Sequence, residues 1–333
     1  MTTAPSRALS RRGFCALSLI AAGTPLRAEP ERTAPAWPRR PVRLVTRPAD
    51  GARSDAMART LAAALSRRWR QPVAVDYRPG GDGSASVETF LATRDDHALL
   101  LSSTAVWTTL HLTHDNLSFD PERDLVPLAP VVQDYIVIGV APTLGLTTVG
   151  EVVDAAHRSP GTLTWSSSLH APYLAFSAFL KAARAELSFV PCRNPLGVAA
   201  DLAEGRVDLA FLTLPPAIGA VQSGRIRLIA MASTERAPGA PAVPTVVEGG
   251  LPSLAMLSGH SLFGPRDMPM TVRARIADDV AAALGDPVLA ERLIRMGYRP
   301  QLDPPATFQA LLQRERAHWS GLAQASYATT AAQ

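Results

Sequence analysis

Short apolar runs alternate with amphipathic helical patterns along most of the chain. The runs have the length of buried strands. The first three strands are expected at Pro41–Thr46, Val73–Tyr77 and His97–Ser103. The segment Ser54–Trp69 carries an apolar residue at every fourth position, which predicts a helix with one buried face and a cap at Ser54 or Asp55.

The same alternation continues through the second half of the chain. Further strands are expected at Ile136–Ala141, Leu163–Ser166, Leu187–Pro191, Val207–Leu212 and Ile226–Ala232. Helices fall between them, and Thr148 with Glu151 has the spacing of a capping box at one helix start. The tail from Met270 is mostly helical in pattern.

Strand–helix alternation is typical of parallel sheets with helices on both faces. A chain of 333 residues is long enough for two such sheets. The Pro-rich segments near 120–130 and 238–252 are expected to cross between them. We therefore predict an α/β fold of two lobes, with a ligand cleft between them at the C-terminal ends of strands.

The charge of the chain changes this picture only at its N-terminus. The net charge is +4, from 33 Lys and Arg against 29 Asp and Glu. Residues 1–28 hold four arginines and no acid, so the remainder carries 29 basic and 29 acidic residues. A neutral remainder gives no electrostatic basis for binding nucleic acid.

Residues 1–28 have the layout of an export signal peptide. Arg11 and Arg12 precede an apolar stretch, and small residues near Ala28 mark the expected cleavage site. The paired arginines resemble a twin-arginine signal, with a Sec signal as the alternative. Residues 29–37 are rich in Pro and Ala and are expected to form a tether. Export to the periplasm leaves Cys192 as the single cysteine, which excludes an internal disulfide.

Collinear motifs over nearly the whole chain after the leader carry a resemblance to a known family. The matching segments are Trp37–Val45, Tyr77–Gly83, Phe119–Pro127, Gly205–Leu209, Ser223–Arg227, Val243–Pro252 and 286–319. Together they resemble the periplasmic substrate-binding proteins of tripartite tricarboxylate transporters, the Bug family. The resemblance implies a type II periplasmic-binding-protein-like fold, with two parallel-rich sheets flanked by helices.

The family resemblance also implies an organisation and a function. Residues 38–133 and 246–333 are expected to form one lobe, and residues 134–245 the other. The protein is then a monomeric receptor that captures a small organic acid or related solute for the membrane subunits of a tripartite transporter. No catalytic residue, metal or cofactor is implied.

The first lobe is expected to bind the solute through loops that follow its strands. The candidates there are Gly51, Ala52, Arg53, Ser54, Gly81, Ser103 and Thr104. A carboxylate at such a turn meets backbone N–H groups and the positive end of a helix. Arg53 departs from the family pattern; it either adds a guanidinium to the site or pairs with Asp50 on the surface. The glycines near Gly81 fit a plain turn equally well.

The second lobe contributes a matching set of candidates. These are Ser167, Ser168, His170, Arg193 and Thr213. His170 either contacts the ligand or caps a helix. Cys192 stands where the family usually has an aromatic residue, and Leu212 with Thr213 replaces a common Asp-Asn pair. These departures leave the identity of the solute open.

Two other functions remain as alternatives. The same solute trap would serve a sensory protein that signals to a membrane receptor. An exported hydrolase would need Ser261 or Ser103 as its nucleophile, but the segment Gly259–Phe263 lacks the final glycine of a nucleophile elbow. The pair His111 and His114 has helical spacing, but two histidines alone are weak evidence for a metal.

Overall fold

The computed structural model describes residues 37–47, 52–78, 83–112, 114, 116–167, 171–192 and 197–330, without the side chains of residues 52, 53 and 325–330. The predicted signal peptide and nearly all of the tether lie outside these residues. No helix among the described residues combines the length and the apolar character needed to cross a membrane.

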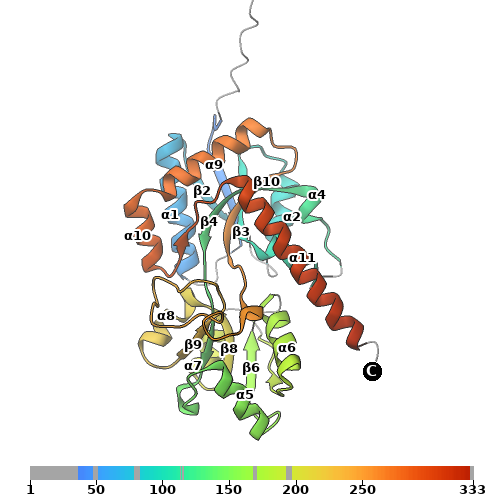
Figure 1. The fold of residues 1–333 in the computed structure, drawn as a ribbon. Helices are drawn as coiled ribbons and strands as arrows, with labels where there is room; N and C mark the ends of the chain where they lie inside the picture. The colour runs from blue at the N-terminus through green and yellow to red at the C-terminus, as the bar shows by residue number, and fades with distance from the viewer. Residues whose placement is uncertain are drawn as a thin grey trace, which may run out of the picture. The chain divides into compact units, whose positions relative to one another are not determined.

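The described strands form two sheets, one of six strands and one of five. The first has the order β11-β4-β10-β3-β1-β2 and the second β7-β6-β8-β5-β9. Figure 1 labels β2, β3, β4 and β10 of the first sheet and β6, β8 and β9 of the second. The strands of the first sheet are β1 (Val42–Thr46), β2 (Val73–Tyr77), β3 (Ala98–Ser103), β4 (Leu125–Gln133), β10 (Gly259–Pro265) and β11 (Arg299–Pro300). Those of the second are β5 (Ile136–Val140), β6 (Thr164–Ser167), β7 (Ser188–Phe189), β8 (Leu209–Thr213) and β9 (Arg227–Met231).

Helices connect most of these strands. They are α1 (Ala52–Trp69), α2 (Ser84–Thr93), α3 (Ala105–Thr108), α4 (Pro121–Asp124), α5 (Val149–Arg158), α6 (Ala171–Ala183), α7 (Gly197–Ala203), α8 (Leu214–Gln222), α9 (Met270–Leu284), α10 (Pro287–Arg295) and α11 (Pro305–Thr330). Short 3₁₀ turns occur at Leu110–Leu112, Pro142–Leu144 and Pro252–Leu254.

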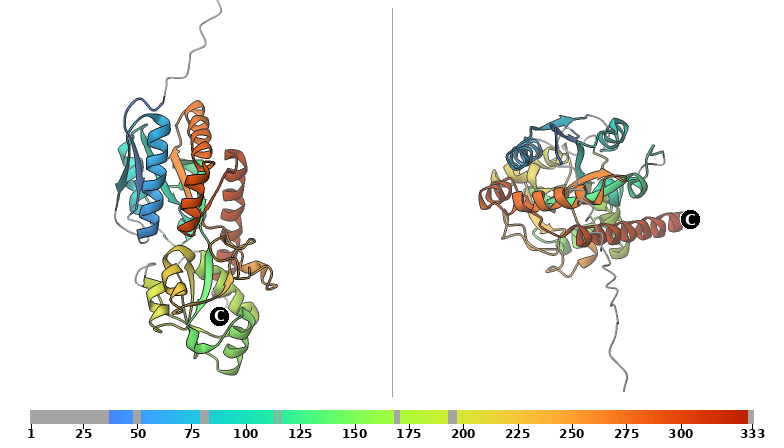
Figure 2. Two further views of the ribbon diagram at one scale, coloured as in Figure 1. Left: turned by 90° about the vertical axis from the view of Figure 1, so that its left-hand side faces the viewer. Right: turned by 90° about the horizontal axis from the view of Figure 1, so that it is seen from above.

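Alternating side chains of the strands enter cores on opposite faces of each sheet. In β1, Leu44 packs with α1, α9 and α10, whereas Val45 packs with α2, α3 and α11. Figure 2 shows α1 and α9 side by side on their face of the first sheet. In β5, Ile138 packs with α5 and α6, and Val137 packs with α7 and α8. The period of two that defines a strand thus gives each sheet helices on both faces.

Both sheets are mixed rather than purely parallel. Strand β1 is parallel to β2 and β3, and β6 is parallel to β7 and β8. Strands β4 and β10 run antiparallel to each other, and β5 runs antiparallel to β8 and β9. Strands β5 and β10 each enter from the other sheet without a crossover helix, so they are free to run opposite to their neighbours.

The expected crossing near residues 120–130 is wrong, because the structure places strand β4 there. Pro127 and Pro130 lie within this strand, opposite Phe263 and Ser261 of β10. The register between the two strands shifts next to each of these pairs. Proline has no N–H for the ladder, and the irregularities accommodate its loss in a central strand.

The chain crosses between the sheets at two short segments. Asp134 and Tyr135 connect β4 to β5, and Leu257 and Ser258 lead back into β10. The two crossings are hydrogen-bonded to each other, because Asp134 N donates to Ser258 O at 3.1 Å. The division into lobes at residues 133/134 and 245/246 stays a prediction. The crossing expected near residues 238–252 is wrong, because Val246, Leu254 and Met256 still pack in the core of the second sheet.

Helix α11 also joins the two sheets. Phe308 and Leu312 belong to a core of the first sheet, and Trp319 belongs to a core of the second. Arg316 Nη1 donates to Trp107 O at 2.8 Å and fixes the middle of the helix to α3. The two sheets are therefore joined by two strand crossings and by one helix whose side chains pack in cores of both.

Two predicted helix starts have different outcomes. The Thr148 hydroxyl accepts a hydrogen bond from Glu151 N at 3.1 Å, which confirms the cap of α5. The Glu151 carboxylate instead accepts from Thr147 N and its hydroxyl. The cap predicted at Ser54 or Asp55 is wrong, because α1 begins at Ala52. Ser54 lies in the first turn, where its hydroxyl accepts from the Tyr298 hydroxyl at 3.2 Å.

Replacing Gly259 with alanine is expected to destabilise the protein. A Cβ atom at this position would lie 2.3 Å from Val132 O, so β4 and β10 would have to separate beside the crossing. We expect a loss of about 1–3 kcal/mol or more in the free energy of unfolding, measured by denaturant titration. Gly321→Ala is the control: a Cβ there meets nothing within 4 Å, and we expect a gain of about 0.5–1 kcal/mol. Equal stability of Gly259→Ala and the unmodified protein would contradict the packing described.

Candidate functional site

A pocket lies where strand ends of the two sheets face each other. Its volume is about 150 Å³. Thr46, Ser103 and Thr213 line it from the C-terminal ends of β1, β3 and β8. Asp134, Ser258 and His260 line it from the crossings and the start of β10. This is the position in which α/β folds bind small ligands.

The first sheet contributes hydroxyl groups to the pocket. Ser54 and Ser103 both line it, from α1 and from the end of β3. The Ser103 hydroxyl accepts from Ala105 N at 3.2 Å, and the Ser54 hydroxyl accepts from Tyr298. Each hydroxyl can still donate its own proton to a bound anion. Thr104 also lines the pocket, but its backbone N–H already donates to Gly259 O at 2.9 Å.

At the end of β8, the second sheet contributes a hydroxyl group to the pocket, and its backbone amides are not available as donors. Thr213 precedes α8 and makes no side-chain capping bond. The first residue of α8, Leu214, donates its N–H to Tyr135 O at 2.7 Å. Pro215 and Pro216 follow and have no N–H. The expectation of free amides at a strand end therefore fails at this helix, and the Thr213 hydroxyl is the donor available.

The remaining predicted site residues are not placed in the pocket lining. Ser167 is fully buried at the end of β6 and is not among the residues that line the pocket, and its carbonyl accepts from Cys192 Sγ at 3.3 Å. The backbone of Ala52 and Arg53 forms the start of α1. Gly51, Gly81, Ser168, His170 and Arg193 lie outside the described residues.

Three charged or titratable residues of the pocket were missed by the sequence analysis. Arg47, Asp134 and His260 all line it. Asp134 Oδ2 lies 3.6 Å from His260 Nδ1, and the Asp134 side chain is 6% exposed. Burial lowers the pKa of His260; the Asp134 carboxylate opposes this change and Arg47 adds to it. His260 is therefore neutral at neutral pH. The one sequence feature that could have indicated Asp134 is its position as an acidic residue between the apolar segments that form β4 and β5.

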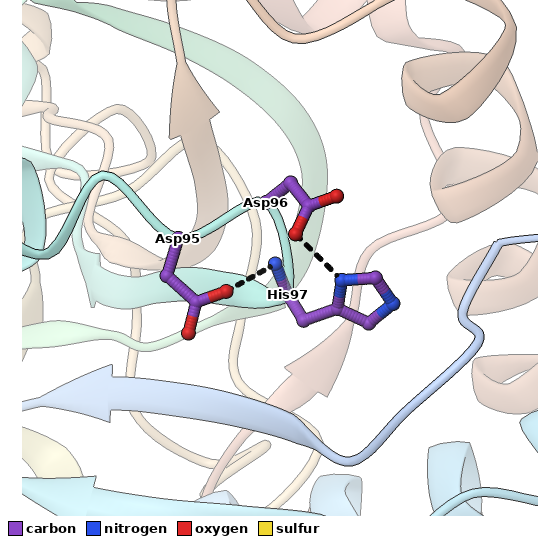
Figure 3. Close-up of side chains that lie close together, drawn as sticks. All are labelled: Asp95, Asp96 and His97. Atoms are coloured by element: carbon purple, nitrogen blue, oxygen red, sulfur yellow. Dashed lines mark hydrogen bonds and ion pairs between the residues drawn. The ribbon is translucent and has the colours of Figure 1, made fainter.

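A cluster of Asp95, Asp96 and His97 has the composition of a metal site (Figure 3). The groups in it are already engaged with protein partners. Arg40 Nη2 lies 2.6 Å from Asp95 Oδ1 and 2.7 Å from Asp96 Oδ1. Asp96 Oδ1 lies 2.8 Å from His97 Nδ1, and His97 Nε2 accepts from Arg39 N at 2.9 Å. The cluster fixes the turn before β3 through these bonds.

The two histidines with helical spacing point to separate partners. His111 lies against α11, where its Nε2 is 3.2 Å from Ser320 Oγ and its Nδ1 is 3.1 Å from Arg316 Nη1. Burial, together with Arg316, lowers the pKa of His111 to about 4. His114 Nδ1 lies 3.3 Å from Leu110 O. His111 thus helps to hold α11 against the first sheet.

Comparison with known proteins decides the family. Residues 57–326 match the sequence profile of the tripartite tricarboxylate transporter family receptor, TctC. The chain belongs to this family. The predicted resemblance is therefore confirmed.

Curated relatives and solved structures agree with membership of the TctC family. Protein BugT of Bordetella pertussis is 24% identical over 294 residues, which cover 87% of this chain and 90% of BugT. A UPF0065 protein of Pseudomonas sp. strain P51 is 28% identical over 291 residues, 86% of each chain.

Two solved structures of similar fold hold dicarboxylates. Rpa4515 of R. palustris with adipate is 26% identical and has a TM-score of 0.77 over 86% of this chain and 97% of that one. MatC of Rhodopseudomonas palustris with bound malate has a TM-score of 0.74 at 22% identity, over 86% of this chain and all of that one. The predicted two-lobed, periplasmic-binding-protein fold is confirmed.

Asp95 is expected to stabilise the fold in a pH-dependent way. Burial alone would raise its pKa, but hydrogen bonds from Arg40, His97 N and Arg43 outweigh burial and lower it from 3.8 to about 2. A carboxyl with a lowered pKa stabilises the folded state above its unfolded pKa, and this contribution disappears as the pH falls from about 4 to about 2.

We therefore expect Asp95→Asn to lose about 2 kcal/mol at pH 7. The difference from the unmodified protein should shrink steadily below pH 4, in denaturant titrations at several pH values. The control variant is Asp154→Asn, at an exposed position on α5, and we expect little loss of unfolding free energy at any of these pH values. A difference that is constant from pH 7 to pH 3 would contradict the role assigned to the Asp95 charge.

Proposed function

We propose that the protein is an extracytoplasmic receptor that captures a small carboxylate solute in the pocket between its two sheets. The observation that carries the proposal is that this pocket is lined by hydroxyl groups from both sheets, at the ends of β3 and β8. Rpa4515 and MatC, which share the fold, are complexes with the dicarboxylates adipate and malate. A pocket of about 150 Å³ limits the solute to a small molecule.

The described residues supply suitable chemistry for an anion. Ser54, Ser103 and Thr213 bring hydroxyl donors, and Arg47 brings a guanidinium to the same lining. Charge-assisted hydrogen bonds to a carboxylate are about twice as strong as neutral ones. We include Gly51, Ala52, Arg53, Gly81, Thr104, Ser167, Ser168, His170 and Arg193 in the proposed binding set on the family resemblance.

Ligand capture is proposed to close the pocket by a hinge motion. Asp134–Tyr135 and Leu257–Ser258 are short, lie side by side and form the strand connections between the sheets. Few-residue connections of this kind absorb a change of backbone angle while the packed cores move as units. A solute that contacts both sheets favours the closed arrangement by its higher affinity for that arrangement.

The proposal contains no catalytic step. The Ser261 side chain, one of the two candidate nucleophiles, is fully buried in β10 and cannot meet a substrate there. The Ser103 hydroxyl accepts a hydrogen bond from the start of α3. These positions favour binding over hydrolysis.

We further propose that the receptor is exported to the periplasm, cleaved near Ala28, and acts as a monomer. Its partners would be the membrane subunits of a tripartite transporter. Capture of a sensor kinase instead of a permease, in cross-linking from membranes, would favour the sensory alternative.

A thermal-shift screen of residues 29–333 against organic acids tests the proposed function. A ligand present at a hundred times its dissociation constant stabilises the folded state by about 2.7 kcal/mol, which raises the melting temperature by several degrees. Saturating stabilisation by one or a few acids is expected. No response to mono-, di- and tricarboxylates at millimolar concentration would overturn the proposal.

Thr213→Val is expected to weaken binding of the acid that the screen identifies. Valine has nearly the same shape but cannot donate a hydrogen bond to a carboxylate, a bond worth about 1.5–3 kcal/mol. We expect the dissociation constant to rise at least about tenfold in calorimetric titrations, with little change in thermal stability. The control is Thr307→Val, at an exposed position on α11. Unchanged affinity in Thr213→Val would exclude this hydroxyl from the binding site.

A further inference from the structure

The Asp134 carboxylate is a buried charge whose partners are incomplete. Its side chain is 6% exposed, and Oδ1 is buried with no hydrogen-bond partner among the described residues. The residue lines the pocket from the crossing between β4 and β5. Burial of a carboxylate is costly unless donors or a cation compensate it. Asp134 therefore places an oxygen without a described donor at the pocket wall.

The neighbouring His260 does not supply a donor to Asp134. His260 Nδ1 lies 3.6 Å from Asp134 Oδ2, beyond hydrogen-bonding range, and within the described part of the chain Nδ1 is buried and makes no hydrogen bond. Burial lowers the pKa of His260, so the ring is neutral at neutral pH and adds no positive charge. When Nε2 carries the ring proton, Nδ1 is a second acceptor beside the carboxylate. The two residues then present hydrogen-bond acceptors side by side, and a ligand with a donor group would satisfy both.

The charged lining of the pocket is also of mixed sign. Among the described lining residues, Arg47 and Asp134 are the charged side chains, one of each sign. Arg47 suits the carboxylate of a solute, whereas Asp134 repels a second carboxylate brought close to it. A dicarboxylate without a cationic group would therefore bring one of its carboxylates close to the negatively charged Asp134. A solute with a cationic donor would match both charges.

We propose that the solute is an amino-carboxylate, whose ammonium group donates to the Asp134 carboxylate with His260 Nδ1 as second acceptor. An ammonium group both neutralises the buried charge and supplies up to three N–H donors. A hydroxyl group would supply a hydrogen bond without the charge. This inference rests on the proposed function, because it assumes that the pocket binds the carboxylate end of the same solute.

The test uses acids that differ at one substituent. Succinate, malate and aspartate share a skeleton and carry hydrogen, hydroxyl and ammonium at the same carbon. Butanoate and 4-aminobutanoate provide a second matched pair with one carboxylate. Dissociation constants for residues 29–333 are measured by calorimetry at pH 7. We expect the amino member of at least one set to bind about tenfold or more tightly than its hydrogen counterpart, with malate between the two.

The variant Asp134→Asn tests whether Asp134 recognises the ammonium group of the solute or only supports the fold. The amide keeps the shape and removes the charge, so the preference for the amino member should fall about tenfold while affinity for the hydrogen counterpart stays equal or rises. Asp154→Asn removes one exposed carboxylate on α5 and should leave the preference unchanged. A second pocket variant, His260→Phe, should reduce the preference by a smaller factor. Melting temperatures of all variants report whether each is folded.

The outcomes separate the two proposals. Succinate or butanoate binding as tightly as the amino members overturns the amino-carboxylate inference and leaves carboxylate capture standing. A preference for amino members that survives in Asp134→Asn overturns the role of Asp134. Binding of no acid in either set, amino or plain, overturns the inference together with the proposed function.

Discussion

The hydrogen bond between Asp134 N and Ser258 O joins the two strand crossings on which the arrangement of the sheets depends. The sheets have separate cores on both faces, so each packs against its own helices. The relative position of the two sheets is set by the short paired segment where β4 continues into β5 and the chain returns into β10. Close backbone packing at Gly259, beside this pair, leaves no room for a side chain.

The pocket follows from this constraint. Because the crossings are short, strand ends from the two sheets must face each other across them, and the side chains of Asp134 and His260 form part of the lining. Polar residues at strand ends then meet in one small space: Ser103 from one sheet and Thr213 from the other. Helix α11 adds a third link, since Trp319 packs in the second sheet's core and Phe308 in the first's. Any closing motion has to pivot about all three.

The sequence predicted the features that depend on local pattern. The apolar spacing of α1 and the Thr148 cap of α5 are examples, because neighbours along the chain determine them. It failed at β4, where Pro127 and Pro130 argue against a central strand and only the register shifts against β10 make one possible. Asp134 and His260 were missed because they are far apart in sequence and meet only through the crossings. Ser103 and Thr213 were found because polar residues at strand ends are visible in the sequence itself.

If one small carboxylate is enclosed between the two sheets, a crystal structure of residues 29–333 with the most stabilising acid will show where it binds. We expect the acid in the pocket, in contact with Ser103 or Ser54 from one sheet and Thr213 from the other. An acid bound behind the crossings, in the groove beside Arg299 and Gln301, or on an outer surface would contradict it.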